Sequence, residues 1–370
     1  MNRFNRAMQG VEGANKRLPK QPQPFFRRCF PLWLDQRGRE LIHEVLFREG
    51  VEVRFRAMLS VLLLRFITFS FALLFFFVST SEAQDPSRID PLKAAMLSAL
   101  FPGGGHFYLG EKEKGLAYLG SEMSLALGAI FLENELAKKP NDELNPLFLL
   151  ALKGHELGVY TAYRSARLMT QNRGYETPVD ESPLSDFLLA PFRLDHLLHP
   201  YVYLGALAGA ALTLGEVFLE NPKRRYGDIR SVRAAGIRSG REGGLLLYEA
   251  DLALVSLSAA VGEEGIWRGL LQTEAERSFG STRGWLFTSF LFGLAHLFNP
   301  NVELTSGKTL YQVSVASLGG LYLGWIYQKE HYQLSRSIAT HFWFNIFAGT
   351  TAFLLDPKEN PLGVRVEFRF

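Results

Sequence analysis

The chain has very little cysteine and very little net charge. Cys29 is the one cysteine in 370 residues, which excludes an intramolecular disulfide and a cysteine-based metal site. It lies in a polar stretch from Pro19 to Pro31, where we expect an incidental residue rather than a nucleophile. A net charge of +3 does not indicate a nucleic-acid partner, and no groove pattern of aromatic and basic residues is present. We predict no nucleic-acid binding.

Two further motifs are missing. No helix carries the His-Glu-x-x-His pattern of zinc peptidases. The glycines of Pro102-Gly-Gly-Gly105 are not followed by Lys-Ser/Thr, so they are not a phosphate-binding loop. They indicate close packing of helices instead, and we expect His106 beside them to be an interfacial residue.

The chain is rich in apolar helix candidates. Hydrophobic residues make up 47% of it and 30 residues are Phe, whereas the mean hydropathy of +0.02 averages these runs with long polar segments. We predict an all-α fold, a polytopic membrane bundle of about six to eight transmembrane helices, each needing about 20 apolar residues. The apolar helices that we predict span Leu116–Leu132, Leu147–Met169, Tyr201–Leu219, Leu245–Gln272, Gly284–Phe298, Leu310–Gln328 and Ser337–Leu355.

The first part of the chain has the pattern of a processed leader. Arginines precede an apolar run from Phe66 to Val78, and Ser81-Glu82-Ala83 places small residues where signal peptidase reads them. We expect residues 1–57 to be a disordered or non-native leader and residues 58–83 to be a signal peptide or an N-terminal anchor, with Met58 as the functional start.

The remainder divides into three predicted parts. Residues 84–240 form a membrane hairpin module with polar and basic loops, 245–355 form the core, and 356–370 form a short tail. The loop before the core is dense in arginine, as the cytoplasmic side of a span often is. The tail alternates apolar and charged residues, which predicts an exposed strand.

Three apolar helices near the end of the chain carry ionisable or amide groups that a membrane span should lack. A charge at the bilayer centre costs at least about 2.5 kcal/mol, so several charges in one bundle indicate a buried polar site. The residues concerned are Glu263, Glu264 and Arg268 in the first helix, His296 in the second, and His341 and Asn345 in the third.

This set of side chains can activate water and stabilise an oxyanion. Glu264 and Arg268 are four residues apart and can pair on one helix face, which leaves Glu263 as a base. Alternatively, all three form a structural ion cluster. Asn345 can donate to an oxyanion or cross-link helices as a polar contact.

The same residues resemble the signature of a known family. Glu263-Glu264-Gly-Ile-Trp-Arg268-Gly-Leu-Leu-Gln, Phe292-Gly-Leu-Ala-His296 and His341-Phe-Trp-Phe-Asn345 are similar, in this order, to the motifs of the CPBP family. These are the CAAX-protease and bacteriocin-processing (Abi) intramembrane endopeptidases. The resemblance covers about Leu245 to Leu355. One departure is Trp267, where the family usually has Phe.

The resemblance implies a role for each residue. Glu263 would activate the attacking water, with His296 helping to position it, and Glu264 would pair with Arg268. His341 and Asn345 would bind the oxyanion. An older view of the family makes Glu263, His296 and His341 zinc ligands. We expect the metal-free mechanism and no cofactor, with zinc as the alternative.

The resulting prediction is a glutamate-dependent intramembrane endopeptidase in a bacterial inner membrane, acting on a membrane-embedded protein or peptide. The alternative is a catalytically silent scaffold or immunity factor of the same fold. A transporter would instead distribute its polar residues along a path, whereas here they are gathered in one place.

Overall fold

The computed structural model describes residues 86–136, 145–220, 225–234, 237–298, 307–362 and 364–368. The predicted leader, signal segment and start lie outside these residues. In chain order the longer helices are α3 (Pro91–Leu100), α5 (Lys112–Leu136), α6 (Pro146–Met169), α9 (Pro200–Glu220), α10 (Arg241–Glu264), α12 (Ser281–Ala295), α13 (Gly307–Lys329) and α14 (Ser335–Leu355). The shorter helices are α4 (Gly104–Tyr108), α7 (Leu184–Leu189), α8 (Leu194–Leu197) and α11 (Thr273–Phe279). Single 3-10 turns lie at Pro86–Arg88, Ala190–Phe192, Tyr226–Asp228, His296–Phe298 and Pro357–Glu359.

The chain turns between α3 and α5 at the glycine-rich segment. Asp90 caps α3 by accepting hydrogen bonds from the amides of Leu92 and Lys93. The chain then breaks at Gly103, whose φ of +73° is a left-handed conformation that favours glycine. A Cβ there would also lie 2.3 Å from the carbonyl oxygen of Gly115, so α4 and α5 approach closely at this turn.

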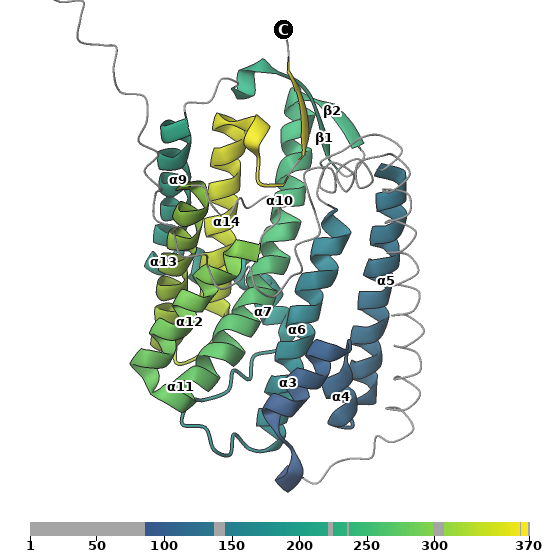
Figure 1. Ribbon diagram of the computed structural model, residues 1–370, viewed down its shortest axis with the longest axis vertical. Helices are drawn as coiled ribbons and strands as arrows, with labels where there is room; N and C mark the ends of the chain where they lie inside the picture. The colour runs from purple at the N-terminus through teal and green to yellow at the C-terminus, as the bar shows by residue number, and fades with distance from the viewer. Residues whose placement is uncertain are drawn as a thin grey trace, which may run out of the picture. The chain divides into compact units, whose positions relative to one another are not determined.

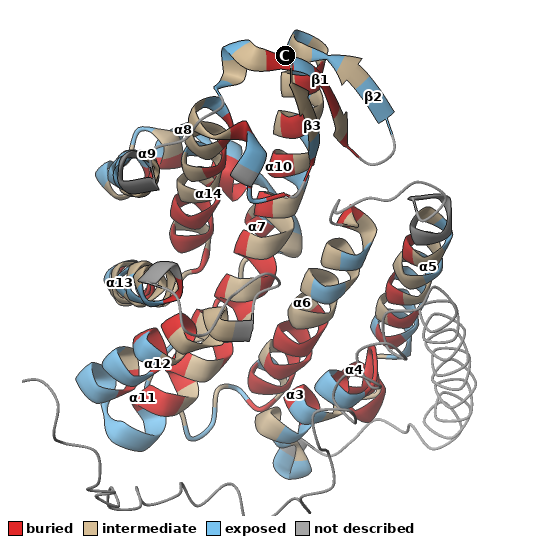
Figure 2. Cartoon of the chain, turned by 45° about the horizontal axis from the view of Figure 1, so that its top comes forward, coloured by how far each residue is buried: buried red, intermediate tan, exposed pale blue. Residues whose placement is uncertain are grey.

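The arrangement of the helices places the core between α6, α10 and α14. Figure 1 shows α5, α6 and α10 side by side, with α9, α13 and α14 beyond α10. In the packing, α9 lies along α14, α12 along α13, and α6 along both α3 and α10. The α6 helix packs inward. Figure 2 shows buried residues on the facing sides of α6 and α10.

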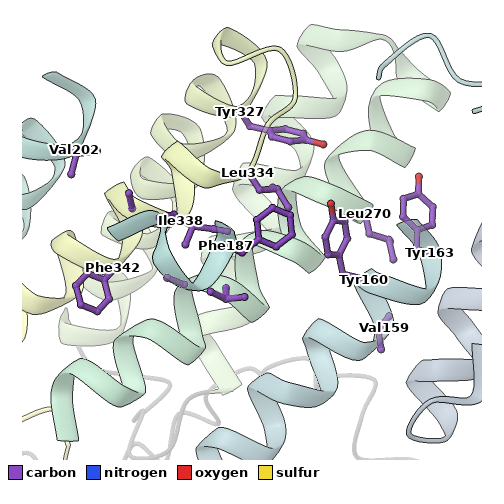
Figure 3. Packing of buried hydrophobic residues seen from close by; sticks show 14 of the residues in the cluster. Val159, Tyr160, Tyr163, Phe187, Val202, Leu270, Tyr327, Leu334, Ile338 and Phe342 are labelled. Carbon is purple, nitrogen blue, oxygen red and sulfur yellow. The ribbon is translucent and has the colours of Figure 1, made fainter. Parts of the chain in front are cut away.

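The main apolar core joins α6 to the last helix. Tyr160 and Tyr163 of α6 belong to the same buried cluster as Phe187, Ile338 and Phe342, whose side chains are drawn in Figure 3. Because burial of one large apolar side chain stabilises by about 1.5–3 kcal/mol, this cluster fixes the position of α14 relative to α6.

The all-α prediction is wrong in one respect. A three-stranded antiparallel sheet of order β2-β1-β3 is formed by β1 (Ile229–Ala234), β2 (Ile237–Gly240) and β3 (Arg365–Phe368). The strand predicted in the tail is therefore present, but the other two strands of the sheet fall in the segment that we interpreted only as a basic loop. Ile229 and Val232 are fully buried against the last helix and α10, which the charge of this segment conceals in the sequence.

Among the described residues, three helices are long and apolar enough to cross a membrane: Lys112–Leu132, Arg241–Phe279 and Ser335–Leu355. The last two carry most of the predicted site residues. The predicted total of six to eight spans stays a prediction.

Candidate functional site

The two glutamates lie at the end of α10, where the helix changes its winding. Residues Gly265–Gln272 continue α10 as a π-helix, and α11 follows without a break. π-helical turns are uncommon and occur frequently at functional sites. The predicted helix Leu245–Gln272 therefore lies within a longer continuous helical stretch, and its wider turn begins directly after Glu264.

Glu264 and Arg268 form the pair that their spacing predicts. Arg268 Nη1 donates to Glu264 Oε1 at 3.0 Å, and their side chains are 2% and 0% exposed. His341 Nδ1 donates to the same oxygen at 2.8 Å. A buried carboxylate needs such partners, because an unpaired buried charge is costly. Three residues from two helical segments thus form one buried polar cluster.

Glu263 points to other partners. Lys153 Nζ of α6 lies 3.0 Å from its Oε1, whereas His341 Nε2 lies 3.9 Å from its Oε2. The second distance exceeds a direct hydrogen bond and is one at which a bridging water should be considered. His341 therefore lies between the two glutamates, bonded to one and facing the other.

This geometry constrains the protonation of His341. Since Nδ1 donates to Glu264, a neutral ring presents a lone pair at Nε2, and only the imidazolium presents a second N–H. A hydrogen bond donated by Nε2 therefore requires a ring that carries a proton on both nitrogens.

Phe292 lies at the centre of the aromatic side of the site. Its ring is 4.6 Å from the Arg268 guanidinium carbon and makes edge contacts with His296, His341 and Trp267. His296 Nδ1 donates to the carbonyl of Phe292 at 2.9 Å, which leaves Nε2 for another partner. Trp267, which stands where the family usually has Phe, makes an edge contact with this Phe292 ring.

A cavity of about 1060 Å³ opens beside the cluster, between α9, α10, α13 and α14. His296, His341 and Asn345 contribute to its wall, together with apolar side chains, and Glu216 and Asp356 also border it. The volume is in the range of a ligand-sized pocket. Neither Glu263 nor Glu264 borders the cavity, so His341 connects the glutamates to it.

The structure thus brings four of the six predicted site residues together, and the other two lie along the cavity wall. Glu263, Glu264, Arg268 and His341 are in one cluster, and His296 and Asn345 border the cavity beside it. Within the described segments, no group of three or more His, Cys, Asp or Glu side chains is arranged to hold a metal ion. Metal dependence itself stays a question for experiment.

Sequence reasoning missed Lys153. The signal was present, because α6 carries Lys153, His155 and Glu156 within a largely apolar run, but nothing in the sequence connects α6 to α10. Phe292 was noted only as part of a motif, and its central position depends on how α12 packs.

Comparison with known families supports the resemblance found in the sequence. A family model described as type II CAAX prenyl endopeptidase Rce1-like matches residues 247–347. The resemblance to the CPBP and CAAX-protease family is confirmed, and the matched segment contains all six predicted site residues. Searches of curated proteins and of solved structures found no match.

Proposed function

We propose that the chain is a CAAX-type intramembrane endopeptidase, in which Glu263 activates water to hydrolyse a peptide bond of a membrane-associated protein or peptide. The family match and the three apolar helices support a membrane peptidase. The observation that carries the proposal is the position of His341, bonded to Glu264, facing Glu263 and bordering the cavity.

The proposed reaction uses Glu263 as a general base. The carboxylate takes a proton from a water molecule, and the water oxygen bonds to the carbonyl carbon of the substrate peptide. The developing oxyanion accepts hydrogen bonds from the Asn345 amide and the His341 imidazolium. The C–N bond then breaks, and the proton held by Glu263 passes to the leaving amine. His296 Nε2 contributes to holding the water.

Glu264 and Arg268 have supporting roles in this proposal. Their pair fixes the orientation of His341, as the carboxylate partner of a catalytic imidazole does. Phe292 shields the pair from water, which strengthens the electrostatic interactions inside the site.

The test is a comparison of membrane proteins from strains that carry the wild type or Glu263→Gln. The substitution keeps size and polarity but removes the proton acceptor, so turnover should fall by about 10²–10⁴ with folded yield unchanged. A substrate should accumulate uncut. A peptide ending in a prenylated CAAX sequence is the first direct probe, following the family description. Asn345→Ala should lower turnover by about 10²–10³.

Glu249→Gln is the matched control. Glu249 lies on the same helix as Glu263 but far from it, and its carboxylate accepts a hydrogen bond from the Thr350 hydroxyl of α14. It should cleave like the wild type. Full activity in Glu263→Gln would refute the proposed chemistry, and an unchanged cellular phenotype in that variant would favour the scaffold alternative. Loss of cleavage on chelation, with recovery on adding zinc, would contradict the metal-free step.

A further inference from the structure

Helix α6 lies unusually close to the end of α10, at the position of the two glutamates. A Cβ on Gly262 would lie 2.7 Å from the carbonyl oxygen of Lys153 and 3.1 Å from Glu156 Oε2. Further along, Gly265 and Gly269 contact the ring of Tyr160, and a Cβ on them would lie only 3.0 and 2.2 Å, respectively, from ring carbons. Glycine on this face therefore permits a contact that any larger residue would prevent.

This contact brings an ammonium group to Glu263. Lys153 Nζ lies 3.0 Å from Glu263 Oε1 and 2.8 Å from Glu156 Oε1, and the three side chains are between 16% and 24% exposed. The three charges sum to −1. The cluster thus keeps one net negative charge, and each of its two partly buried carboxylates has the Lys153 ammonium as a partner.

The pairing also distinguishes the two oxygens of Glu263. Oε1 is held by Lys153, whereas Oε2 faces His341 Nε2 at 3.9 Å. A carboxylate bound through one oxygen cannot rotate freely, so the other oxygen stays directed toward the imidazole. Glu156, which lies about one helical turn later in α6, in turn holds the Lys153 ammonium group in place.

We propose that Lys153 of α6 is a positioning residue for the reaction, which anchors Oε1 of Glu263 and leaves Oε2 to take the proton from water. The inference rests on the proposed function. It extends the site to a helix outside the segment 247–347 that matches the family. The simpler interpretation is that Lys153 and Glu156 only brace the bundle.

The first test compares Lys153→Met, Lys153→Arg and the exposed-lysine control Lys329→Met, with rates for the prenylated CAAX peptide normalised to folded protein. Misplacement of a reacting group by about 1 Å can cost about 10²-fold. We expect kcat of Lys153→Met to fall by about 10–10², with KM unchanged, and Lys153→Arg to recover part of the loss. The control should match the wild type.

Three outcomes would overturn the inference: full activity in Lys153→Met, an equal loss in the Arg and Met variants, or a change in KM alone. Its failure is distinguishable from failure of the proposed function. An inactive Glu263→Gln with a fully active Lys153→Met refutes only the role of Lys153, whereas an active Glu263→Gln refutes the proposed chemistry itself.

A second measurement needs no substrate. Thermal unfolding in detergent is recorded for Lys153→Met, Glu263→Gln and the double variant. If Lys153 holds the Glu263 carboxylate, Lys153→Met lowers Tm less in the Glu263→Gln background than in the wild type. An equal decrease in both backgrounds would show that the two side chains are not coupled, and the proposal would be wrong.

Discussion

Arg268 and Glu264 are excluded from solvent, so each depends on the other for neutralisation. Arg268→Ala leaves a buried carboxylate with only His341 as a partner. We predict a loss of about 3–5 kcal/mol in the free energy of unfolding, the cost of breaking a buried pair. Thermal unfolding in detergent measures it. Replacing both residues by apolar ones should recover part of the loss, and an unchanged Tm in Arg268→Ala would contradict the pairing.

The carboxyl group of Glu111, in the turn before α5, predicts that the stability of the folded chain depends on pH in the acidic range. Burial raises the pKa of its carboxyl, but hydrogen bonds and charges from His106 and Lys114 outweigh it and lower the pKa from 4.5 to about 2. The folded state thus favours the ionised form, and this contribution is complete above pH 4.5 and lost as the pH falls toward 2. We expect Glu111→Gln to lower Tm at about pH 6, by an amount that shrinks toward pH 2. A difference that does not vary with pH would refute this.

The same turn corrects one expectation about a single residue. His106 was expected at an interface, but it is fully buried. Its Nδ1 contacts Glu111 at 2.7 Å, its Nε2 contacts Thr161 at 3.1 Å, and its ring stacks on Tyr118. The partner from α6 is 55 residues away in the chain, so no local pattern could have revealed it.

At the scale of elements, α9 and α14 have a long shared interface that depends on small residues. A Cβ on Gly209 would lie 2.5 Å from the carbonyl oxygen of Phe344, whereas a Cβ on Gly215 of the same helix would contact nothing within 4 Å. We predict that Gly209→Ala lowers the free energy of unfolding by about 1–3 kcal/mol through overpacking. Gly215→Ala should be neutral or stabilising by up to about 1 kcal/mol. Equal Tm values for both variants would contradict the close approach.

The helices could be predicted from sequence, and the sheet could not. Apolar runs placed α5, α6, α9 and the last four long helices within a few residues of most of their bounds. Strands β1 and β2 were missed because six or fewer residues with several arginines give too little periodicity, and because β1 pairs with a strand more than 130 residues later. Long-range pairing of this kind leaves no local signal.

At the scale of the whole molecule, the segment that matches the family model lacks helices that its own helices pack against. Residues 247–347 contain the site, but α6 and α9 lie outside them and provide the packing surfaces for α10 and α14. We predict that residues 241–370 expressed alone give little folded protein, and that co-expression with residues 1–240 restores it. Size-exclusion chromatography and thermal unfolding in detergent check this. A monodisperse fragment with the Tm of the full chain would contradict it.

The π-helical segment Gly265–Gln272 fixes the number of residues between two sets of contacts, in addition to the residue types that make them. Before it, Glu264 contacts His341. At its last residue Gln272 Nε2 lies 3.2 Å from Gly324 O of α13, and directly after it the Thr273 hydroxyl lies 3.3 Å from Tyr327 Oη of α13. Loss of one residue between these points would change the winding of this segment and shift one set of contacts relative to the other. Natural relatives that keep this site should therefore differ here by substitutions and not by single-residue gaps.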